Sequence, residues 1–357
     1  MTPSPDTTAP IDLATDIRGS RPLSVGVAGA TGNVGTMMLR VLHERGIPVA
    51  SLRAFASSRS TGRTVESGDH SAQVEVLEDA DPAGLDVALF SAGGDRALQH
   101  AQRFADAGVV VIDNSSAFRM HDRVPLVVPE VNADAVRTHE GIIANPNCST
   151  IQLVAVLNPI LQAAGLERVQ VTTFQSVSGT GQAAMEELQR QAGDVLEARP
   201  VETNVYPHQI AFNVLPHCDS FDGDGNTKEE LKLVNESRKI LGVPDLRVAA
   251  TCVRVPVFNS HSEAVHLQTT RPLSPDEARE LLAAAPGVRV VDDPSANRYP
   301  MPIDASGVDD VLVGRIRRDD SVENGLALFI CADNLRKGAA TNAVQVLEAL
   351  VTRDQLS

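Results

Sequence analysis

Basic residues are scarce in this chain and nowhere clustered. Its 357 residues include 31 Lys and Arg against 46 Asp and Glu, a formal net charge of -15. No run of five or more Lys or Arg creates a basic face, and a chain this negative is repelled by the phosphates of a nucleic acid. The composition therefore excludes a nucleic acid as a partner.

Paired cysteines and long apolar runs are missing as well. Without a C-x-x-C pair, the chain indicates neither a disulfide framework nor a zinc knuckle, which favours a reducing compartment. No apolar stretch approaches the ~18 residues of a membrane span, so no membrane partner is expected. The cysteines lie far apart in the sequence, as Cys148, Cys218, Cys252 and Cys331.

The N-terminal segment lacks a targeting signal. It is polar and rich in Pro and Thr, with neither the apolar core of a secretory signal nor the acid-poor character of a transit peptide. We interpret residues 1–22 as a disordered tail and expect a cytoplasmic protein.

The rest of the chain is long enough for two domains of about 150 residues each. Over residues 23–148, short apolar strands alternate with helical segments, which predicts a doubly wound parallel sheet and a Rossmann-like α/β domain. Residues 149–331 mix helices with alternating strands and predict an α+β domain with an antiparallel or mixed sheet. We expect a final helix within residues 332–357 to complete the first domain.

Glycines recur at every third position where the first strand ends and a helix begins. Gly26, Gly29, Gly32 and Gly35 depart from the strict G-x-G-x-x-G pattern. Small residues here would nevertheless let the backbone approach a pyrophosphate at the helix N-terminus. The alternative is a plain tight turn between strand and helix.

The end of the second expected strand indicates which dinucleotide would bind. An NAD site would place Asp or Glu there to bond the ribose hydroxyls. This chain has Ser57, Ser58, Arg59 and Ser60 instead, and an arginine flanked by serines suits a 2′-phosphate. The pattern favours NADP as cofactor. The alternative is that these residues form a solvated loop without a role in cofactor binding.

Cys148 directly precedes an apolar helix, in the segment ANPNCST. A thiol at a helix N-terminus lies near the positive end of the helix dipole, which lowers its pKa toward the thiolate that attacks carbonyl carbon. The alternative is a buried, inert cysteine, and we assign that role to Cys252, which lies inside an expected strand.

Several segments carry a resemblance to a known family: GATGNVG, SSRS, SSAFRM, NPNCST, QSVSGTG, RVPV followed by HSE, and NLRKGAA. In this order, from Val25 to the C-terminal helix, the chain resembles the aspartate-semialdehyde dehydrogenases, in their bacterial branch. The resemblance implies an NADP-dependent enzyme that converts 4-phospho-L-aspartate to L-aspartate 4-semialdehyde and phosphate. It further implies a role in lysine (through diaminopimelate), threonine, methionine and isoleucine synthesis, and a homodimer formed largely through the second domain.

The resemblance also implies three catalytic residues. Cys148 would form an acyl-thioester, Gln175 would orient it, and His261 would be the acid and base. The chemistry agrees, because a thiolate that displaces phosphate from an acyl phosphate gives a thioester, a far better hydride acceptor than a carboxylate. After reduction by NADPH, His261 would handle the proton, a task suited to a group that titrates near neutrality.

Substrate and cofactor residues are implied in the same way. Arg254 would hold the substrate carboxylate, for which its bidentate fork is suited, and Glu229 the amino group. Arg119 and Lys232 would bind phosphate, although Glu229 and Lys232, three apart on a helix, also fit a surface ion pair. The residues that would line the cofactor are Gly29, Thr31, Gly32, Asn33, Val34, Gly35, Arg59, Ser60, Ser178, Gly179 and Asn334.

Four alternatives are weaker. An N-acetylglutamyl-phosphate reductase would carry a G-C-Y motif where this chain has N-C-S-T, and a glyceraldehyde-3-phosphate dehydrogenase would carry Ser-Cys-Thr-Thr and an NAD-selecting acid. A nucleotide-binding paralogue without activity would not need to keep Cys148, Gln175, Arg254 and His261 together. His261-Ser262-Glu263 lacks the P-C-x-x-C partner of a deaminase zinc site, so no metal is expected.

Overall fold

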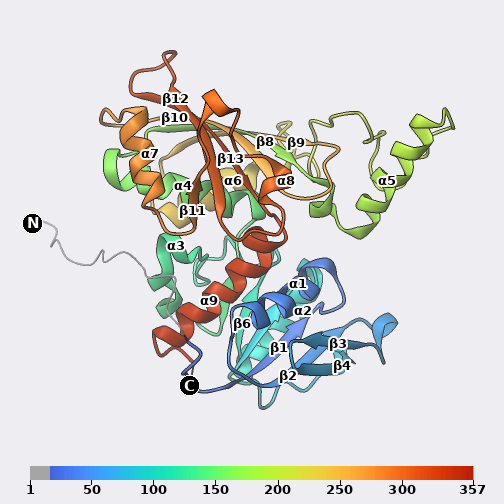
Figure 1. The fold of residues 1–357 in the computed structure, drawn as a ribbon. Coiled ribbons are helices and arrows are strands. Elements are labelled where there is room, and N and C mark those ends of the chain that lie inside the picture. The colour runs from blue at the N-terminus through green and yellow to red at the C-terminus, as the bar shows by residue number, and fades with distance from the viewer. Residues whose placement is uncertain (1–16, 357) are drawn as a thin grey trace, which may run out of the picture.

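The computed structural model describes residues 17–356 and places them in two sheet-containing domains, one below the other in Figure 1. Residues 1–16 of the expected tail lie outside the described residues. Ile17 is only 4% exposed and packs into the core of the first domain. Residues 17–22, which the sequence placed in the tail, therefore belong to the described part of the chain, and Ile17 belongs to the first domain. Among residues 17–356, no helix is both long and apolar enough to cross a membrane.

The first domain is built on a seven-stranded sheet with the order β3-β4-β2-β1-β5-β6-β7. All neighbouring strands run parallel except β3 and β4, which form an antiparallel pair at one edge that the sequence pattern did not indicate. The strands are β1 (Leu23–Ala28), β2 (Val49–Ala56), β3 (Thr64–Ser67), β4 (His70–Val76), β5 (Val87–Phe90), β6 (Val110–Asp113) and β7 (Ile142–Ala144).

Helices cover both faces of this sheet, as expected for a doubly wound fold. On one face, α1 (Asn33–Glu44) and the C-terminal α9 (Thr341–Thr352) share a core with β1, in which Leu42 and Leu347 are fully buried. On the other face, α2 (Gly94–Asp106) inserts Phe104 against Phe55 and Phe90, with edge-to-face ring contacts at 5.7 and 5.1 Å. The short α3 (Pro129–Asn132) leads toward β7. The predicted Rossmann-like architecture is confirmed.

The second domain has a mixed six-stranded sheet with the order β11-β12-β13-β10-β8-β9. Its β8/β9 and β11/β12 pairs are parallel and the others antiparallel, which confirms the expected α+β class. The strands are β8 (Arg168–Gln175), β9 (Arg247–Arg254), β10 (His261–Gln268), β11 (Val288–Val290), β12 (Val311–Arg318) and β13 (Gly325–Ala332). The helices are α4 (Cys148–Ala164), α5 (Gln182–Leu196), α6 (Lys228–Leu241), α7 (Pro275–Ala283) and α8 (Pro302–Ala305).

Helix α4 lies between the two sheets. Val154 belongs to the core of the first domain, whereas Leu153 and Val156 belong to the core of the second. A helix buried on both sides must be apolar nearly all round, as the segment IQLVAVLNPIL is. The N-terminal end of α4, with Cys148 as its first residue, is thereby fixed where the domains meet.

Candidate active site

Cys148 lines a cavity of about 330 Å³ between the domains. The side chain of Asn147 caps α4, because its Oδ1 accepts hydrogen bonds from the backbone N–H groups of Ser149 (3.0 Å) and Thr150 (3.4 Å). The cavity is lined by all seven residues expected for catalysis and substrate binding: Cys148, Gln175, His261, Arg119, Glu229, Lys232 and Arg254. The cofactor candidate Gly179 lines it too, together with Ser116, Asn147, Thr180 and Asp219.

The strand order of the second sheet explains why three of these residues meet. Gln175 is the last residue of β8 and lies in register with Arg254, the last residue of the parallel β9. His261 is the first residue of β10, which is antiparallel to β8. The three therefore lie at one edge of the sheet, although they are distant in sequence.

Glu229 is held as an anion. Burial alone would raise its pKa, but the charge of Lys232 and the hydrogen bonds from Gln175, Lys232 and Asn147 lower it to about 2. Its Oε1 accepts from Gln175 Nε2 and from Asn147 Nδ2, both at 3.0 Å, and its Oε2 lies 2.9 Å from Lys232 Nζ. Lys232 also donates to Asp219 at 2.8 Å. Burial lowers the pKa of Lys232, but the charge of Glu229 and the hydrogen bonds to Asp219 and Glu229 raise it above its ordinary value.

The expectation of a lowered thiol pKa is wrong. Burial, and next the negative charge of Glu229, raise the pKa of Cys148 to about 12. The positive charges of Arg119 and Arg254 only partly offset this. The residue therefore rests as a thiol, and the helix terminus alone does not ionise it.

His261 is likewise neutral at rest, rather than titrating near neutrality as the sequence suggested. Burial, and next the charge of Arg254, lower its pKa to about 3. Its Nδ1 accepts the backbone N–H of Ser176 at 3.1 Å, which places the proton of the neutral ring on Nε2. That Nε2 is buried and has no hydrogen-bond partner among the described residues.

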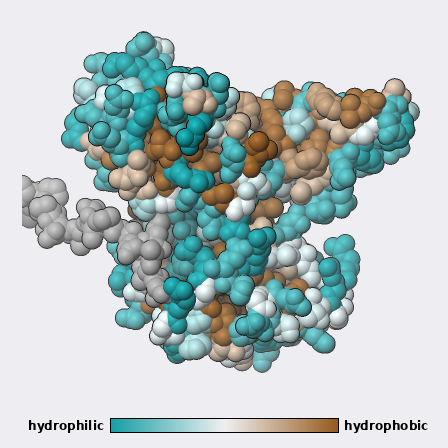
Figure 2. Space-filling view, in the orientation of Figure 1, coloured by the Kyte–Doolittle hydropathy of each residue, from teal (hydrophilic) through white to brown (hydrophobic). Residues whose placement is uncertain are grey.

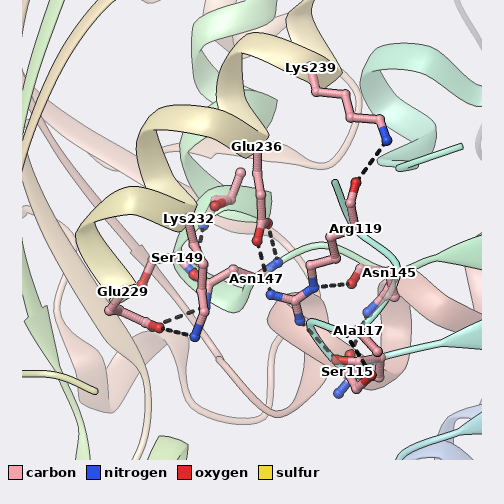
Figure 3. Close-up of polar contacts among 12 residues, drawn as sticks. Ser115, Ala117, Arg119, Asn145, Asn147, Ser149, Glu229, Lys232, Glu236 and Lys239 are labelled. Carbon is pink, nitrogen blue, oxygen red and sulfur yellow. Dashed lines mark hydrogen bonds and ion pairs between the residues drawn. The ribbon is translucent and has the colours of Figure 1, made fainter. Parts of the chain in front are cut away.

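Arg254 and Arg119 are both buried at this cavity and both firmly held. Arg254 donates through Nη1 to the carbonyl of Ser176 at 2.7 Å, while its buried Nε has no partner among residues 17–356. Arg119 donates to the carbonyls of Asn145 and Asn114 and forms an ion pair with Glu236 at 3.1 Å (Figure 3). Two guanidinium groups thus face one cavity, and each has N–H groups that make no hydrogen bond within the described residues.

The turn between β1 and α1 can be formed only by glycine at two of its positions. Gly29 has a φ of +80°, and a Cβ there would lie 2.2 Å from the carbonyl oxygen of Ser91. A Cβ on Gly35 would lie 2.1 Å from the carbonyl oxygen of Gly29. Gly26, in contrast, lies inside β1 against Leu85 and does not belong to the turn. Gly29 and Gly35 are therefore required by the close packing of the turn itself, and the cofactor role of this turn stays a prediction.

The other cofactor candidates divide into two groups. Arg59 is exposed in a 3-10 turn (Ser58–Ser60) after β2 and makes no hydrogen bond or ion pair within residues 17–356. Beside it, the hydroxyls of Ser60 and Thr31 are 3.2 Å apart, and α1 (Asn33–Glu44) has no side-chain cap. These groups fit a phosphorylated dinucleotide, because uncapped N–H groups and an unpaired guanidinium are both free for phosphate.

The second group of cofactor candidates lies away from the β1–α1 turn, beside the catalytic residues. It consists of Ser178, Gly179 and Asn334. Asn334 is buried, and its Oδ1 accepts from Ser178 Oγ and from Ser176 Oγ, each at 3.1 Å. A Cβ on Gly179 would come within 3.1 Å of Nε2 of His261. Asn334 thus holds the loop that carries Ser178, and Gly179 leaves room above the imidazole.

Sequence reasoning missed four residues of the cavity: Ser116, Asn147, Thr180 and Asp219. Only Asn147 carried a usable signal, because Asn directly before a helix is a preferred cap. Asp219 lies in an irregular segment and Thr180 in a single 3-10 turn (Val177–Thr180), where no periodicity predicts what a side chain contacts.

Comparisons with known proteins identify the family of the chain. Residues 24–139 match the semialdehyde dehydrogenase NAD-binding domain, and residues 157–337 the semialdehyde dehydrogenase dimerisation domain. An aspartate-semialdehyde dehydrogenase of Aquifex aeolicus is 52% identical over 331 residues, covering 92% of this chain and 97% of the relative.

Two solved structures extend the comparison. Aspartate semialdehyde dehydrogenase II from Vibrio cholerae, complexed with ASA, has a TM-score of 0.90 and 47% identity, covering 93% of this chain and 99% of that one. The enzyme from Candida albicans, solved with NADP, has a TM-score of 0.74 and 25% identity, covering 94% and 99%. On this similarity in sequence and structure, the chain belongs to the aspartate-semialdehyde dehydrogenase family.

Proposed function

We propose that this chain catalyses the NADPH-dependent reductive dephosphorylation of 4-phospho-L-aspartate to L-aspartate 4-semialdehyde and phosphate. The observation that carries the proposal is one cavity that brings together a thiol, an imidazole, two guanidinium groups and an ion pair between a buried carboxylate and a partly buried ammonium group. The step would supply the synthesis of lysine through diaminopimelate, and of threonine, methionine and isoleucine, in the cytoplasm.

Substrate binding follows from the charges that line the cavity. The buried Nε of Arg254 lacks a partner in the described chain and suits the substrate carboxylate. Glu229, which stays ionised down to a pH of about 2, suits the substrate ammonium. Arg119 keeps two of its five N–H donors, and with Lys232 it would take the phosphate group.

The thioester forms on Cys148. Sγ bonds to the acyl carbon, the bond from that carbon to the phosphate oxygen breaks, phosphate leaves, and the thiol proton passes to Nε2 of His261, in the ring tautomer whose Nδ1–H donates to Ser176 Oγ. Gln175, fixed by its hydrogen bond to Glu229, orients the thioester. NADPH supplies the hydride when bound, held by the β1–α1 turn, Arg59 and Ser60.

Ser176 would allow His261 to take up and release this proton. While Nδ1 is unprotonated it accepts the Ser176 N–H. When Nδ1 carries the ring proton it can instead donate to Ser176 Oγ, which is also 3.1 Å away, and Nε2 is then free to accept the thiol proton. The same serine therefore provides a partner for both protonation states.

A homodimer formed through the second domain is part of the proposal. Figure 2 shows apolar side chains gathered over α5 and the neighbouring part of the second sheet. On the sheet face away from α4, Phe174 stacks on Phe329 at 6.3 Å, and Phe174 is 36% exposed. Such a patch on a monomer is typical of a surface that a partner covers.

The test is a coupled pair of assays on the purified protein. With aspartate semialdehyde, phosphate and NADP⁺, we expect phosphate-dependent formation of NADPH by the wild type and none by Cys148→Ala. The same protein should not turn over glyceraldehyde 3-phosphate or N-acetylglutamate semialdehyde at a comparable rate. A folded wild type without phosphate-dependent turnover of aspartate semialdehyde would refute the proposal.

A further inference from the structure

Helix α6 presents a row of four alternating charges to the active site. Glu229, Lys232, Glu236 and Lys239 follow one another at intervals of three, four and three residues, so they share one face of the helix. Figure 3 shows this face directed at the loops that carry Arg119 and Asn147. Glu229 and Lys232 are assigned to the binding of substrate and phosphate, whereas Glu236 and Lys239 have no assigned role.

Glu236 joins two loops of the site through its two carboxylate oxygens. It is 1% exposed. Oε1 accepts from Nη1 of Arg119 at 3.1 Å, and Oε2 accepts from the backbone N–H of Asn147 at 2.7 Å. Asn147 caps α4 and precedes the cysteine, so a single buried side chain contacts both the phosphate side and the thiol side of the cavity.

The surroundings leave Arg119 few ways to adjust. Its Nε donates to the carbonyl of Asn145 at 2.9 Å and its Nη2 to that of Asn114 at 2.8 Å. Lys239 donates to the carbonyl of Arg119 itself, at 2.8 Å, and to two further carbonyls of the same loop. Glu236 supplies the only carboxylate paired with this guanidinium within residues 17–356.

We propose that Glu236 is a positioning residue that sets the phosphate-binding Arg119 and the catalytic Cys148 at a fixed distance from each other. The inference rests on the proposed function, because it assigns Arg119 to phosphate. During acyl transfer, the sulfur of Cys148 and an oxygen of phosphate bond one after the other to the same acyl carbon. The distance between the bound phosphate and the sulfur therefore governs the rate.

Two possible roles of Glu236, neutralising the charge of Arg119 or positioning it, predict opposite changes in the phosphate KM when the carboxylate is removed. If Glu236 only neutralised Arg119, Glu236→Gln would increase the positive potential at the site and lower the phosphate KM. If it positions Arg119, the amide can accept from only one of the two donors. Its NH₂ group then faces the other donor, so one loop must move.

The experiment compares Glu236→Gln with the wild type and with Glu348→Gln. Glu348 forms a two-hydrogen-bond ion pair with Arg45 in the first domain, away from the cavity, and is the matched control. We expect Glu236→Gln to raise the phosphate KM and lower kcat, each about tenfold, with the KM for aspartate semialdehyde unchanged. The control should match the wild type.

A double-mutant cycle with Arg119→Ala tests the route of the effect. If Glu236 acts through Arg119, Glu236→Gln raises the phosphate KM far less in the Arg119→Ala background. A lowered or unchanged phosphate KM, or full additivity, would overturn the proposal. If Glu236→Gln does not fold, Glu236→Asp keeps the charge and both oxygens but shortens the side chain, and the same rise in phosphate KM is required of it. Wild-type turnover, measured alongside, tests the proposed function separately.

Discussion

The backbone N–H of Ser176 donates to Nδ1 of His261 at 3.1 Å, inside a site where the imidazole is fully buried. This contact and the burial favour the same neutral ring, with its proton on Nε2. Burial, and next the charge of Arg254, lower the pKa of this imidazole, the group expected to exchange protons, to about 3. The imidazolium becomes favourable only when a substrate group or a thiolate supplies negative charge.

This lowered pKa has a consequence for stability. Between its ordinary pKa near 6.5 and pH 3, His261 binds a proton in the unfolded chain but not in the folded one, so stability falls as the pH falls through that window. The loss for one proton is about 1.4 kcal/mol per pH unit. We expect the free energy of unfolding in urea, measured from pH 7 to pH 5, to fall less steeply for His261→Gln than for the wild type. Parallel curves would contradict the buried neutral imidazole.

Glu229→Gln should change substrate binding and thiol reactivity in opposite directions. The negative charge of Glu229 is the second cause, after burial, of the raised pKa of Cys148. Removing it lowers the thiol pKa, so alkylation by iodoacetamide at pH 8 should become faster. The same change removes the partner of the substrate ammonium and should raise the KM for aspartate semialdehyde about tenfold or more.

Cys148→Ser provides the background rate for that experiment, because the other three cysteines are buried. A slower alkylation of Glu229→Gln would show that the carboxylate does not hold the thiol in its protonated form.

The sequence predicted the fold because its signals were local. The turn between β1 and α1, the strands and the helices can each be predicted from patterns of glycine and apolar residues within a short stretch of the chain. It also placed Cys148 correctly at the start of α4. The edge pair β3 and β4 was missed, since two short strands without a strong pattern give little periodicity.

The electrostatics of the site could not be predicted in the same way. The pKa of Cys148 depends on burial between two domains and on Glu229, which is 81 positions away in the chain. A rule for helix termini gave the wrong sign because desolvation is larger than the dipole effect here. Glu236 was overlooked for a related reason, as nothing in the segment KLVNESRK shows that a charged residue faces inward.

Arg59→Glu should separate the two dinucleotides. Arg59 is exposed at the end of β2, without a partner in the described chain, so its replacement disturbs no contact of the fold. We expect the KM for NADP⁺ to rise at least tenfold, because a charge-assisted bond to the 2′-phosphate is replaced by repulsion. The KM for NAD⁺, measured under the same conditions, should change little. Equal losses for both would place the 2′-phosphate contact elsewhere.

Gly338→Ala should impair catalysis through contact with Cys148. Gly338 lies in a π-helical segment (Arg336–Ala340), and a Cβ there would come within 2.8 Å of the Cβ of Cys148. The segment has little freedom to retreat, because the neighbouring Lys337 is buried and bonded to Glu130 at 2.6 Å. Overpacking of this kind typically costs about 1–3 kcal/mol, so the cysteine is expected to shift and kcat to fall about tenfold.

Gly223→Ala is the matched control for that substitution, because no atom lies within 4 Å of a Cβ at this position. The KM for NADP⁺ should be unchanged in both variants, since a Cβ on Gly338 would lie closest to Cβ and Cα of Cys148 and not to an atom of the β1–α1 turn. If kcat of Gly338→Ala equals that of the control, the π-helical segment does not fix the position of Cys148. A loss of kcat with normal thermal stability would show that the glycine serves the position of the sulfur rather than the fold.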